Sequence, residues 1–140
     1  MADSLKIHPT ADVKSESIGR GTMVWQYAVV AAGARIGEDC NLNCHTFVEG
    51  GALLGNRVTL KVGVAVWSAV TLEDDVFVGP NATFTNDLRP RRRRPRPLVP
   101  TRVKCGASIG AGATIGCGVP SGRYPMIGSG SLVTRDVPDY

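Results

Sequence analysis

The sequence predicts an all-β domain in which short strands wind into a triangular prism. Every sixth residue from Ile18 to Phe84 is apolar, which gives twelve apolar positions in succession. At the 43% hydrophobic content of the chain, such a run would arise by chance about 4 times in 100,000. A second column lies four residues after each of these positions, from Thr22 to Ala82, and holds only small or β-branched residues. The 17 Gly and 9 Pro among 140 residues also disfavour a bundle of long helices.

The six-residue period matches neither the roughly 3.6-residue period of a helix nor the two-residue period of a plain strand. Two inward positions in every six fit a short flat strand followed by a bend, and three such units close one triangular coil. The large aliphatic residue fills the interior, and the small residue sits where the chain turns. We therefore expect one domain over residues 1–140 with about six coils, stacked at roughly the 4.8 Å spacing of strands. Glycine often follows the inward aliphatic, as at Gly37 and Gly55, which suits turns that need unusual backbone angles.

A loop interrupts the repeat between residues 88 and 102. The pattern resumes at Ile109, which is 25 residues after Phe84 instead of 24, and Ser121 is then the one polar residue in the first column. The interruption reads LRPRRRRPRPLVPTR, and its four prolines forbid a helix and strand pairing. We therefore expect segment 88–102 to project from the prism.

The positive charge of the chain is concentrated in this loop. Seven of the 16 basic residues lie within it, and the remainder carries nine basic and twelve acidic residues, a net charge of −3. Arginine pairs well with phosphate, whereas a solvated charge run is an equally good interpretation. No aromatic residue interleaves the arginines, so we do not expect a nucleic-acid partner.

The remaining composition indicates a cytoplasmic protein without a membrane partner. No apolar run approaches the roughly 18 residues of a membrane span, and the N-terminal MADSLKIHPT does not have the pattern of a signal peptide. The four cysteines are then expected to be free thiols. A zinc site of three histidines is not expected, because only His8 and His45 are present.

Several segments resemble one enzyme family. They are Met23-Val24-Trp25-Gln26, Cys44-His45-Thr46-Phe47-Val48-Glu49, the stretch from Glu73 to Asn81, the stretch from Phe84 to Arg91, and the tail from Val133 to Tyr140. In these segments the chain resembles the hexapeptide-repeat acyltransferases, and especially sugar-nucleotide N-acetyltransferases that act on dTDP-linked 3-amino-3,6-dideoxyhexoses. Such relatives usually continue past the Asp-Val-Pro-Asp-Tyr ending with a further strand, so we expect an incomplete last coil.

The resemblance implies a fold, a reaction and an assembly. The fold is a left-handed parallel β-helix, and the assembly is a homotrimer with active sites in the clefts between prisms. The reaction is acetyl transfer from acetyl-CoA to a dTDP- or UDP-linked amino sugar, for surface polysaccharide such as lipopolysaccharide. The alternatives are O-acetylation of a small sugar or of serine, and a non-catalytic β-solenoid module. Exposed aromatics off the inward columns suggest a subunit interface, or else scattered surface residues that cap strands: Trp25, Tyr27, Phe47, Trp67 and Phe77.

His45 is the candidate general base. It lies three residues after Leu42, off both inward columns, so its imidazole can face a cleft. A histidine ordinarily has a pKa of about 6.5, which suits proton transfer near neutrality. The alternatives are a solvent-facing or interface histidine, and a reaction assisted by the substrate itself.

Asn86 and Asp87 are the second catalytic candidates, because they stand where the loop leaves the repeat. Asn86 would hydrogen-bond the sugar or the acetyl oxygen, and Asp87 would accept from the substrate ammonium. The alternative is turn formation, which Asn-Asp sequences favour. Candidates for substrate binding are Gln26, Glu49, Trp67, Arg89 and Arg91, although Trp67 could equally pack at the edge of the core.

The glycine-rich coils from Gly106 to Gly130 are the candidate cofactor site. They lack bulky outward side chains, so a pantetheine arm could lie against their backbone, although the glycines could serve the turns alone. The candidates for binding acetyl-CoA are Lys104, Ala107, Ala113, Arg123 and Arg135.

Overall fold

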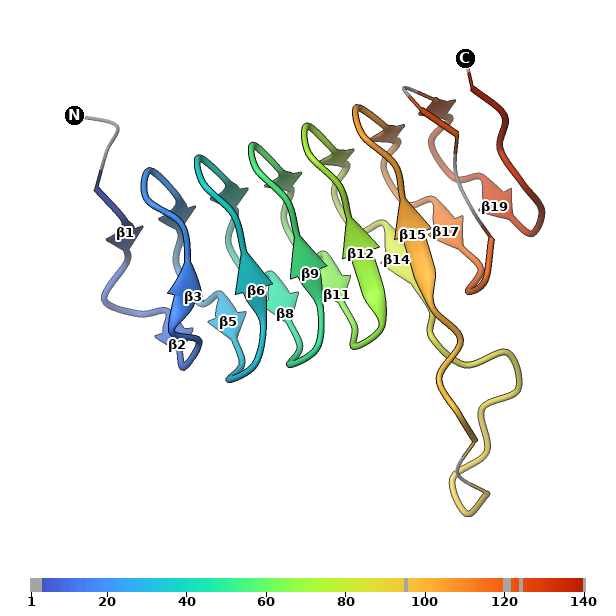
Figure 1. Cartoon of the computed structure of the whole chain (residues 1–140), viewed down its shortest axis with the longest axis horizontal. Coiled ribbons are helices and arrows are strands. Elements are labelled where there is room, and N and C mark those ends of the chain that lie inside the picture. Colours follow the sequence, from blue (N-terminus) through green and yellow to red (C-terminus); the bar gives the residue numbers. More distant parts are fainter. Residues whose placement is uncertain (1–3, 95, 120–121, 124, 140) are drawn as a thin grey trace.

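The computed structural model shows a prism wound from a single chain, with short parallel strands on three flat faces (Figure 1). It describes residues 4–94, 96–119, 122–123 and 125–139. Face A contains β1 (Lys6–Ile7), β4 (Met23–Val24), β7 (Asn41–Leu42), β10 (Thr59–Leu60), β13 (Phe77–Val78), β16 (Ser108–Ile109) and β18 (Met126–Ile127). Face B contains β2 (Asp12–Val13), β5 (Val29–Val30), β8 (Phe47–Val48), β11 (Ala65–Val66), β14 (Thr83–Phe84), β17 (Thr114–Ile115) and β19 (Leu132–Val133). Face C contains β3 (Ser17–Ile18), β6 (Arg35–Ile36), β9 (Leu53–Leu54), β12 (Val70–Leu72) and β15 (Thr101–Val103).

The first apolar column forms the core. Its members stack in register, so that Val24 pairs with Leu42, and Leu42 pairs with Leu60. The second column lies at the corners, where Thr22 and Thr46 are buried and donate their hydroxyl protons to Gly37 O (2.9 Å) and Asn43 O (2.8 Å). The predicted interior is confirmed for the described members of both columns, with only the end coils left partly open. Ser121 lies outside the described residues.

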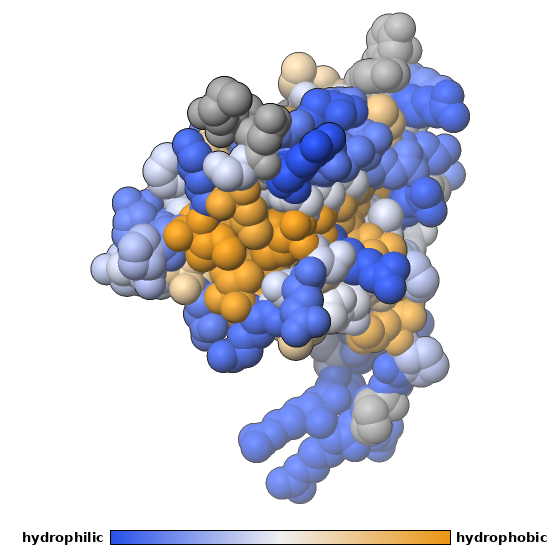
Figure 2. Space-filling view, turned by 60° about the vertical axis from the view of Figure 1, so that its left-hand side comes forward, coloured by the Kyte–Doolittle hydropathy of each residue, from blue (hydrophilic) through white to orange (hydrophobic). Residues whose placement is uncertain are grey.

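The number of coils differs from the prediction, because faces A and B each have seven strands and not about six. Ile7 and Val13 stack on Val24 and Val30, so an additional coil precedes Ile18. Ile18 follows Val13 by five positions instead of six. The six-residue period counted backwards from Ile18 therefore does not detect this coil. Its outer end is uncovered, which leaves Leu5 and Ile7 exposed. Figure 2 shows an apolar patch on the side of the molecule that faces the viewer.

Residues 88–100 project from the prism and form the yellow and orange segment below the coils in Figure 1. Thr101 and Arg102, which the prediction placed in the loop, instead belong to β15 and pair with β12. The segment leaves after β14 on face B and returns as β15 on face C. Across it, Phe77 pairs with Ser108, an offset of 31 residues instead of the usual 18, and the stacking then continues unchanged. The loop is therefore an insertion of 13 residues that leaves the core register intact.

The glycines that follow the inward aliphatics serve close packing and not unusual backbone angles, which corrects the expectation. A Cβ at Gly37 would lie 2.6 Å from the carbonyl carbon of Gly55 in the next coil, a distance that real Cβ atoms do not reach. The left-handed backbone comes two residues later, at Asp39 (φ 54°) and Arg57 (φ 56°). No helix among the described residues has the length and apolar character needed to cross a membrane.

Candidate active site

The predicted site residues occupy corners of the prism, and the structure divides them between two corners that flank face B. Corner AB joins face A strands to face B strands, and it carries Gln26 and His45. Corner BC joins face B strands to face C strands, and it carries Glu49, Trp67 and the exit of the loop. The short strand β8 separates His45 from Glu49, so the two corners are opposite edges of one face. Within one chain, His45 does not meet Asn86 or Asp87.

Corner BC brings Glu49, Ser68 and Asn86 together in successive coils. Glu49 Oε2 accepts a hydrogen bond of 2.7 Å from the Ser68 backbone N–H. Asn86 Nδ2 donates to Ser68 O at 3.2 Å, and Asn86 O accepts from Val99 N at 2.9 Å. These bonds fix the amide of Asn86 and leave its Oδ1 without a partner among the described residues, so that it can accept from a ligand.

Asp87 combines the two roles that the sequence left open. Its Oδ1 accepts a 2.8 Å hydrogen bond from the backbone N–H of Arg89, which is the turn chemistry expected of this residue type. Its second carboxylate oxygen has no hydrogen bond among the described residues and remains available to a cationic group. A turn function and a binding function are therefore compatible at Asp87.

Trp67 is half-buried and packs at the edge of the core. Its Nε1 donates a 2.9 Å hydrogen bond to the backbone carbonyl of Phe84, two residues before Asn86. Its ring lies 5.8 Å from that of Phe47. Thr85, between Phe84 and Asn86, donates to Ile115 O and accepts from Cys117 N. The indole therefore helps to hold the segment from which Asn86 projects.

Corner AB places His45 on the outside of the prism. Its backbone is left-handed (φ 56°), and its N–H donates to Gln26 O at 3.2 Å. Its imidazole stacks on the ring of Tyr27, with centroids 5.3 Å apart and an interplanar angle of 19°. Both side chains are exposed, so the imidazole is presented outward, where a molecule bound outside this chain can reach it.

The predicted cofactor residues do not form one cluster. Lys104 lies at corner CA, which joins face C strands to face A strands, whereas Arg135 is exposed and follows β19. Arg123 is also exposed, and its backbone N–H donates a hydrogen bond to Asp139 Oδ1 (2.6 Å). The methyl groups of Ala107 and Ala113 are fully buried in the core. Their N–H groups also donate to Lys104 O and Gly110 O within the same turns, and their carbonyls accept from Phe77 and Thr83.

The loop arginines Arg89 and Arg91 are exposed. The only side-chain bond of Arg91 among the described residues is to its neighbour Pro90 O (3.0 Å). The guanidinium groups of both residues are therefore free to meet an anion. A cavity of about 490 Å³ lies between the two arms of the loop and is lined by Asp87, Leu88, Arg89, Arg96, Pro97, Leu98 and Val99.

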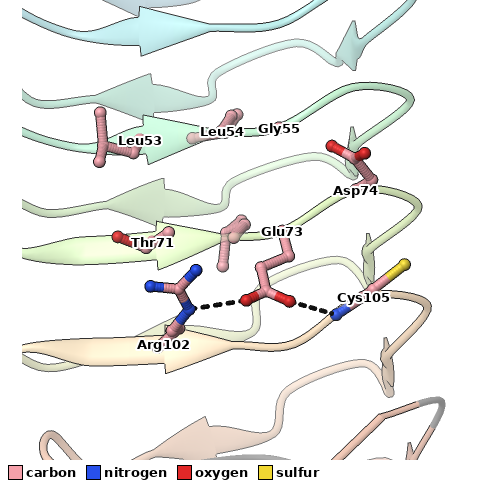
Figure 3. Close-up of a pocket in the computed structure, with 9 residues that line it drawn as sticks. Leu53, Leu54, Gly55, Thr71, Glu73, Asp74, Arg102 and Cys105 are labelled. Carbon is pink, nitrogen blue, oxygen red and sulfur yellow. Dashed lines mark hydrogen bonds and ion pairs between the residues drawn. The ribbon is translucent and has the colours of Figure 1, made fainter.

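Face C has a groove of about 430 Å³ that the sequence analysis did not identify (Figure 3). In it, Arg102 Nε donates to Glu73 Oε2 at 2.6 Å, and the Cys105 N–H donates to Glu73 Oε1 at 3.1 Å. The Arg102 guanidinium lowers the pKa of the Glu73 carboxyl below its usual range. Because the loop separates Glu73 from Arg102 in the sequence, only the register of β12 with β15 reveals the pair.

His8 and His45 both lie at corner AB, in the first and third coils, with the Trp25–Tyr27 turn between them. His8 Nδ1 is bonded to Thr10 Oγ1 at 2.9 Å. Across the described part of the chain, no three His, Cys, Asp or Glu side chains are grouped so that they could hold a metal ion.

Known proteins with similar sequences include two acetyltransferases. The dTDP-3-amino-3,6-dideoxy-alpha-D-galactopyranose 3-N-acetyltransferase of Aneurinibacillus thermoaerophilus is 46% identical over 135 residues, which cover 96% of this chain and 70% of that protein. The galactoside O-acetyltransferase of Lactococcus lactis is 30% identical over 119 residues, 76% of this chain and 56% of that protein. A scan of protein-family profiles gives no match.

The structural comparison supports the same fold. The acetyltransferase domain of PglB from Neisseria gonorrhoeae, solved with acetyl coenzyme A, superposes with a TM-score of 0.51 at 25% identity. The match covers 96% of this chain and 51% of that one, so the chain spans about half of this structural relative. The predicted left-handed parallel β-helix is thereby confirmed.

Proposed function

Because the chain belongs to the hexapeptide-repeat acyltransferases, we propose that it is an acetyl-CoA-dependent N-acetyltransferase acting on a nucleotide-linked amino sugar. The observation that carries this proposal is the 46% identity over 135 residues to an enzyme named for such a reaction. The matched length includes both corners that flank face B. We further propose that the enzyme is cytoplasmic and serves the synthesis of surface polysaccharide precursors.

Corner BC offers the groups that an amine acceptor needs. The free oxygen of Asp87 attracts the substrate ammonium, which releases one proton to solvent before it reacts. Asn86 Oδ1 then accepts an N–H of the neutral amine, which directs its lone pair towards the thioester carbonyl. A C–N bond forms, the C–S bond of acetyl-CoA breaks, and the amine proton is transferred to the departing thiolate. His45 is the group that relays this proton.

A homotrimer would bring the two corners together, with His45 of one chain facing Asn86 and Asp87 of the next. Exposed apolar side chains lie at corner AB and on the faces beside it, namely Trp25, Tyr27, Val62, Phe77, Met126 and Leu132. Lys61 is the only charged residue in the described turns of this corner. Corner AB and its flanks therefore have the composition of a subunit interface.

Mixed trimers test the shared site. His45→Ala and Asn86→Ala/Asp87→Ala are purified alone and after coexpression at equal levels. If each cleft takes His45 from one chain and Asn86 and Asp87 from its neighbour, each variant alone is inactive, and the mixture recovers roughly a quarter of the wild-type rate. A mixture as inactive as its components would contradict a shared cleft. His8→Ala, on the same corner, is the matched control and keeps full activity.

O-acetylation is the second candidate, favoured by the similarity to the galactoside O-acetyltransferase of L. lactis. Matched acceptors that differ only in an amine or a hydroxyl at the reacting carbon distinguish the two reactions. A carboxylate in position to hold an ammonium, as at Asp87, favours the amine. Transfer to the hydroxyl acceptor at a higher kcat/KM would replace the first candidate by the second.

A further inference from the structure

The tip of segment 88–102 carries more positive charge than the proposed reaction uses. Arg92, Arg93, Arg94 and Arg96 follow Arg91 within five residues, and all four are exposed. No described acidic side chain forms an ion pair with any of them, whereas Arg102 at the base of the segment is paired with Glu73. The tip is thus a compact group of unneutralised guanidinium charges that repel one another.

The base of the segment is fixed, and its tip stands clear of the prism. Val99 N–H donates to Asn86 O (2.9 Å), and Arg89 N–H donates to Asp87 Oδ1 (2.8 Å), which joins the two arms to corner BC. Beyond this base the tip turns back with an Arg94 N–H bond to Arg91 O (3.3 Å). Figure 2 shows the segment as a hydrophilic projection that extends away from the prism. The tip can therefore reach a flat surface that the prism itself does not touch.

The tip does not have the form of a site for one small anion. The cavity of the segment lies between its arms, and Arg92, Arg93 and Arg94 do not line it. A single diphosphate is satisfied by two or three convergent cations, which Arg89 and Arg91 near the base can supply. Four further arginines on a protruding turn match an extended array of phosphates instead.

We propose that Arg92, Arg93, Arg94 and Arg96 dock the protein on the surface of an anionic lipid bilayer. Leu88 and Leu98, on the two arms, are 68% and 45% exposed and supply apolar groups that can enter the headgroup region behind the arginines. Contact through the tip alone holds the prism, with its net charge of −3 outside the segment, away from the anionic surface. This docking is distinct from the acetyl transfer and does not depend on it.

A nucleic acid is less well matched by the same features. Segment 88–102 has no aromatic side chain on which a base could stack. A long polyanion would also run past the acidic body, which would repel it, whereas a bilayer meets only the tip. Leu88 and Leu98 have no role in binding phosphates of a duplex.

Vesicle sedimentation tests the proposal with the whole chain of 140 residues. The probes are phosphatidylcholine vesicles with and without about 30 mol% phosphatidylglycerol, at about 0.1 M salt. We expect the wild type to sediment with the anionic vesicles only, and Arg92→Ser/Arg93→Ser/Arg94→Ser/Arg96→Ser to bind them at least about tenfold more weakly. The matched control Lys6→Ser/Lys14→Ser/Arg20→Ser/Arg35→Ser loses the same charge from the body and should bind as the wild type does.

Three results would overturn the proposal. They are equal binding to neutral vesicles, equal loss of binding in both fourfold variants, and tighter binding of the wild type to a duplex of about 20 base pairs than to the anionic vesicles. Acetyl transfer to a soluble acceptor should be unchanged in Arg92→Ser/Arg93→Ser/Arg94→Ser, because this variant keeps Arg89, Arg91 and Arg96, which lines the cavity of the segment. Failure of docking therefore leaves the proposed enzymatic function untouched, and failure of the assay leaves the docking result interpretable.

Discussion

The indole Nε1 of Trp67 donates a 2.9 Å hydrogen bond to the backbone carbonyl of Phe84 in the next coil. Phe84 ends β14, and Asn86 follows two residues later. The bond therefore couples a side chain in the body of the prism to the position of Asn86 and to the start of the projecting loop.

Trp67→Phe keeps the aromatic contact with Phe47 but removes this bond. We expect kcat to fall about tenfold through misplacement of Asn86, with little change in the KM for acetyl-CoA. Trp25→Phe is the control, because it removes a comparable bond, from the Trp25 indole to Asn41 Oδ1 (2.7 Å), at the other corner. Steady-state kinetics and thermal unfolding of both variants separate the two effects. Equal losses of kcat would show that the Trp67 bond acts on stability alone.

His45→Ala tests the proposed proton relay. We expect kcat to fall about 100-fold, because the variant lacks the imidazole proposed to carry the proton. Unchanged unfolding temperature and mass in solution would show that the loss is chemical. A decrease below about threefold would instead favour a reaction in which a group of the substrate itself transfers the proton.

Glu73→Gln tests the ion pair that crosses the groove on face C. Arg102 lowers the pKa of Glu73 in the folded protein, so the ionised pair stabilises the fold above the ordinary glutamate pKa of about 4.3, and this contribution is lost as the pH falls through the lowered value. We expect the variant to be less stable by about 0.5 kcal/mol at neutral pH. The difference, measured by urea unfolding, should shrink as the pH falls below the ordinary glutamate pKa of about 4.3. Glu16→Gln, at an exposed residue without an ion pair among the described residues, is the control and should leave the stability at neutral pH unchanged.

Gly37→Ala tests the close approach of successive coils. The added Cβ would meet the backbone of Gly55, so we expect a loss of about 1–3 kcal/mol in the free energy of unfolding. At Gly128 the nearest atom to an added Cβ is Ser131 Oγ at 3.5 Å, so Gly128→Ala should cost much less. Equal effects of the two substitutions would mean that backbone freedom, and not packing, explains these glycines.

The sequence period identifies the core because the inward positions are chemically constrained in every coil. It fails where the spacing changes by one residue, as between Val13 and Ile18. The period also does not distinguish a glycine that is needed for its backbone angle from one that is needed because the next coil lies close to it, since both positions simply hold glycine. Only the stacking of Gly37 on Gly55 separates the two.

The site is harder to predict because outward residues follow no hydrophobic pattern. One signal was available, since residues 18 apart occupy the same corner of successive coils. Glu49 and Trp67 are related in this way, as are Ser68 and Asn86, whereas Gln26 and Cys44 fall on the other corner. Beyond the loop the offset becomes 31, so Arg102 could not be matched to the Glu73 coil by counting. The six-residue period does predict the observed burial of Ala107 and Ala113, because both occupy the column of small residues.

Direct assay of acetyl transfer tests the central claim. The purified protein is incubated with acetyl-CoA and a dTDP-linked 3-amino-3,6-dideoxyhexose, and the nucleotide sugar is analysed by mass spectrometry. We predict that its mass increases by one acetyl group on the amine, with one equivalent of free CoA released and a rate that falls in Asn86→Ala. An unmodified nucleotide sugar in the presence of the folded protein, or acetyl found on a hydroxyl, would contradict the account.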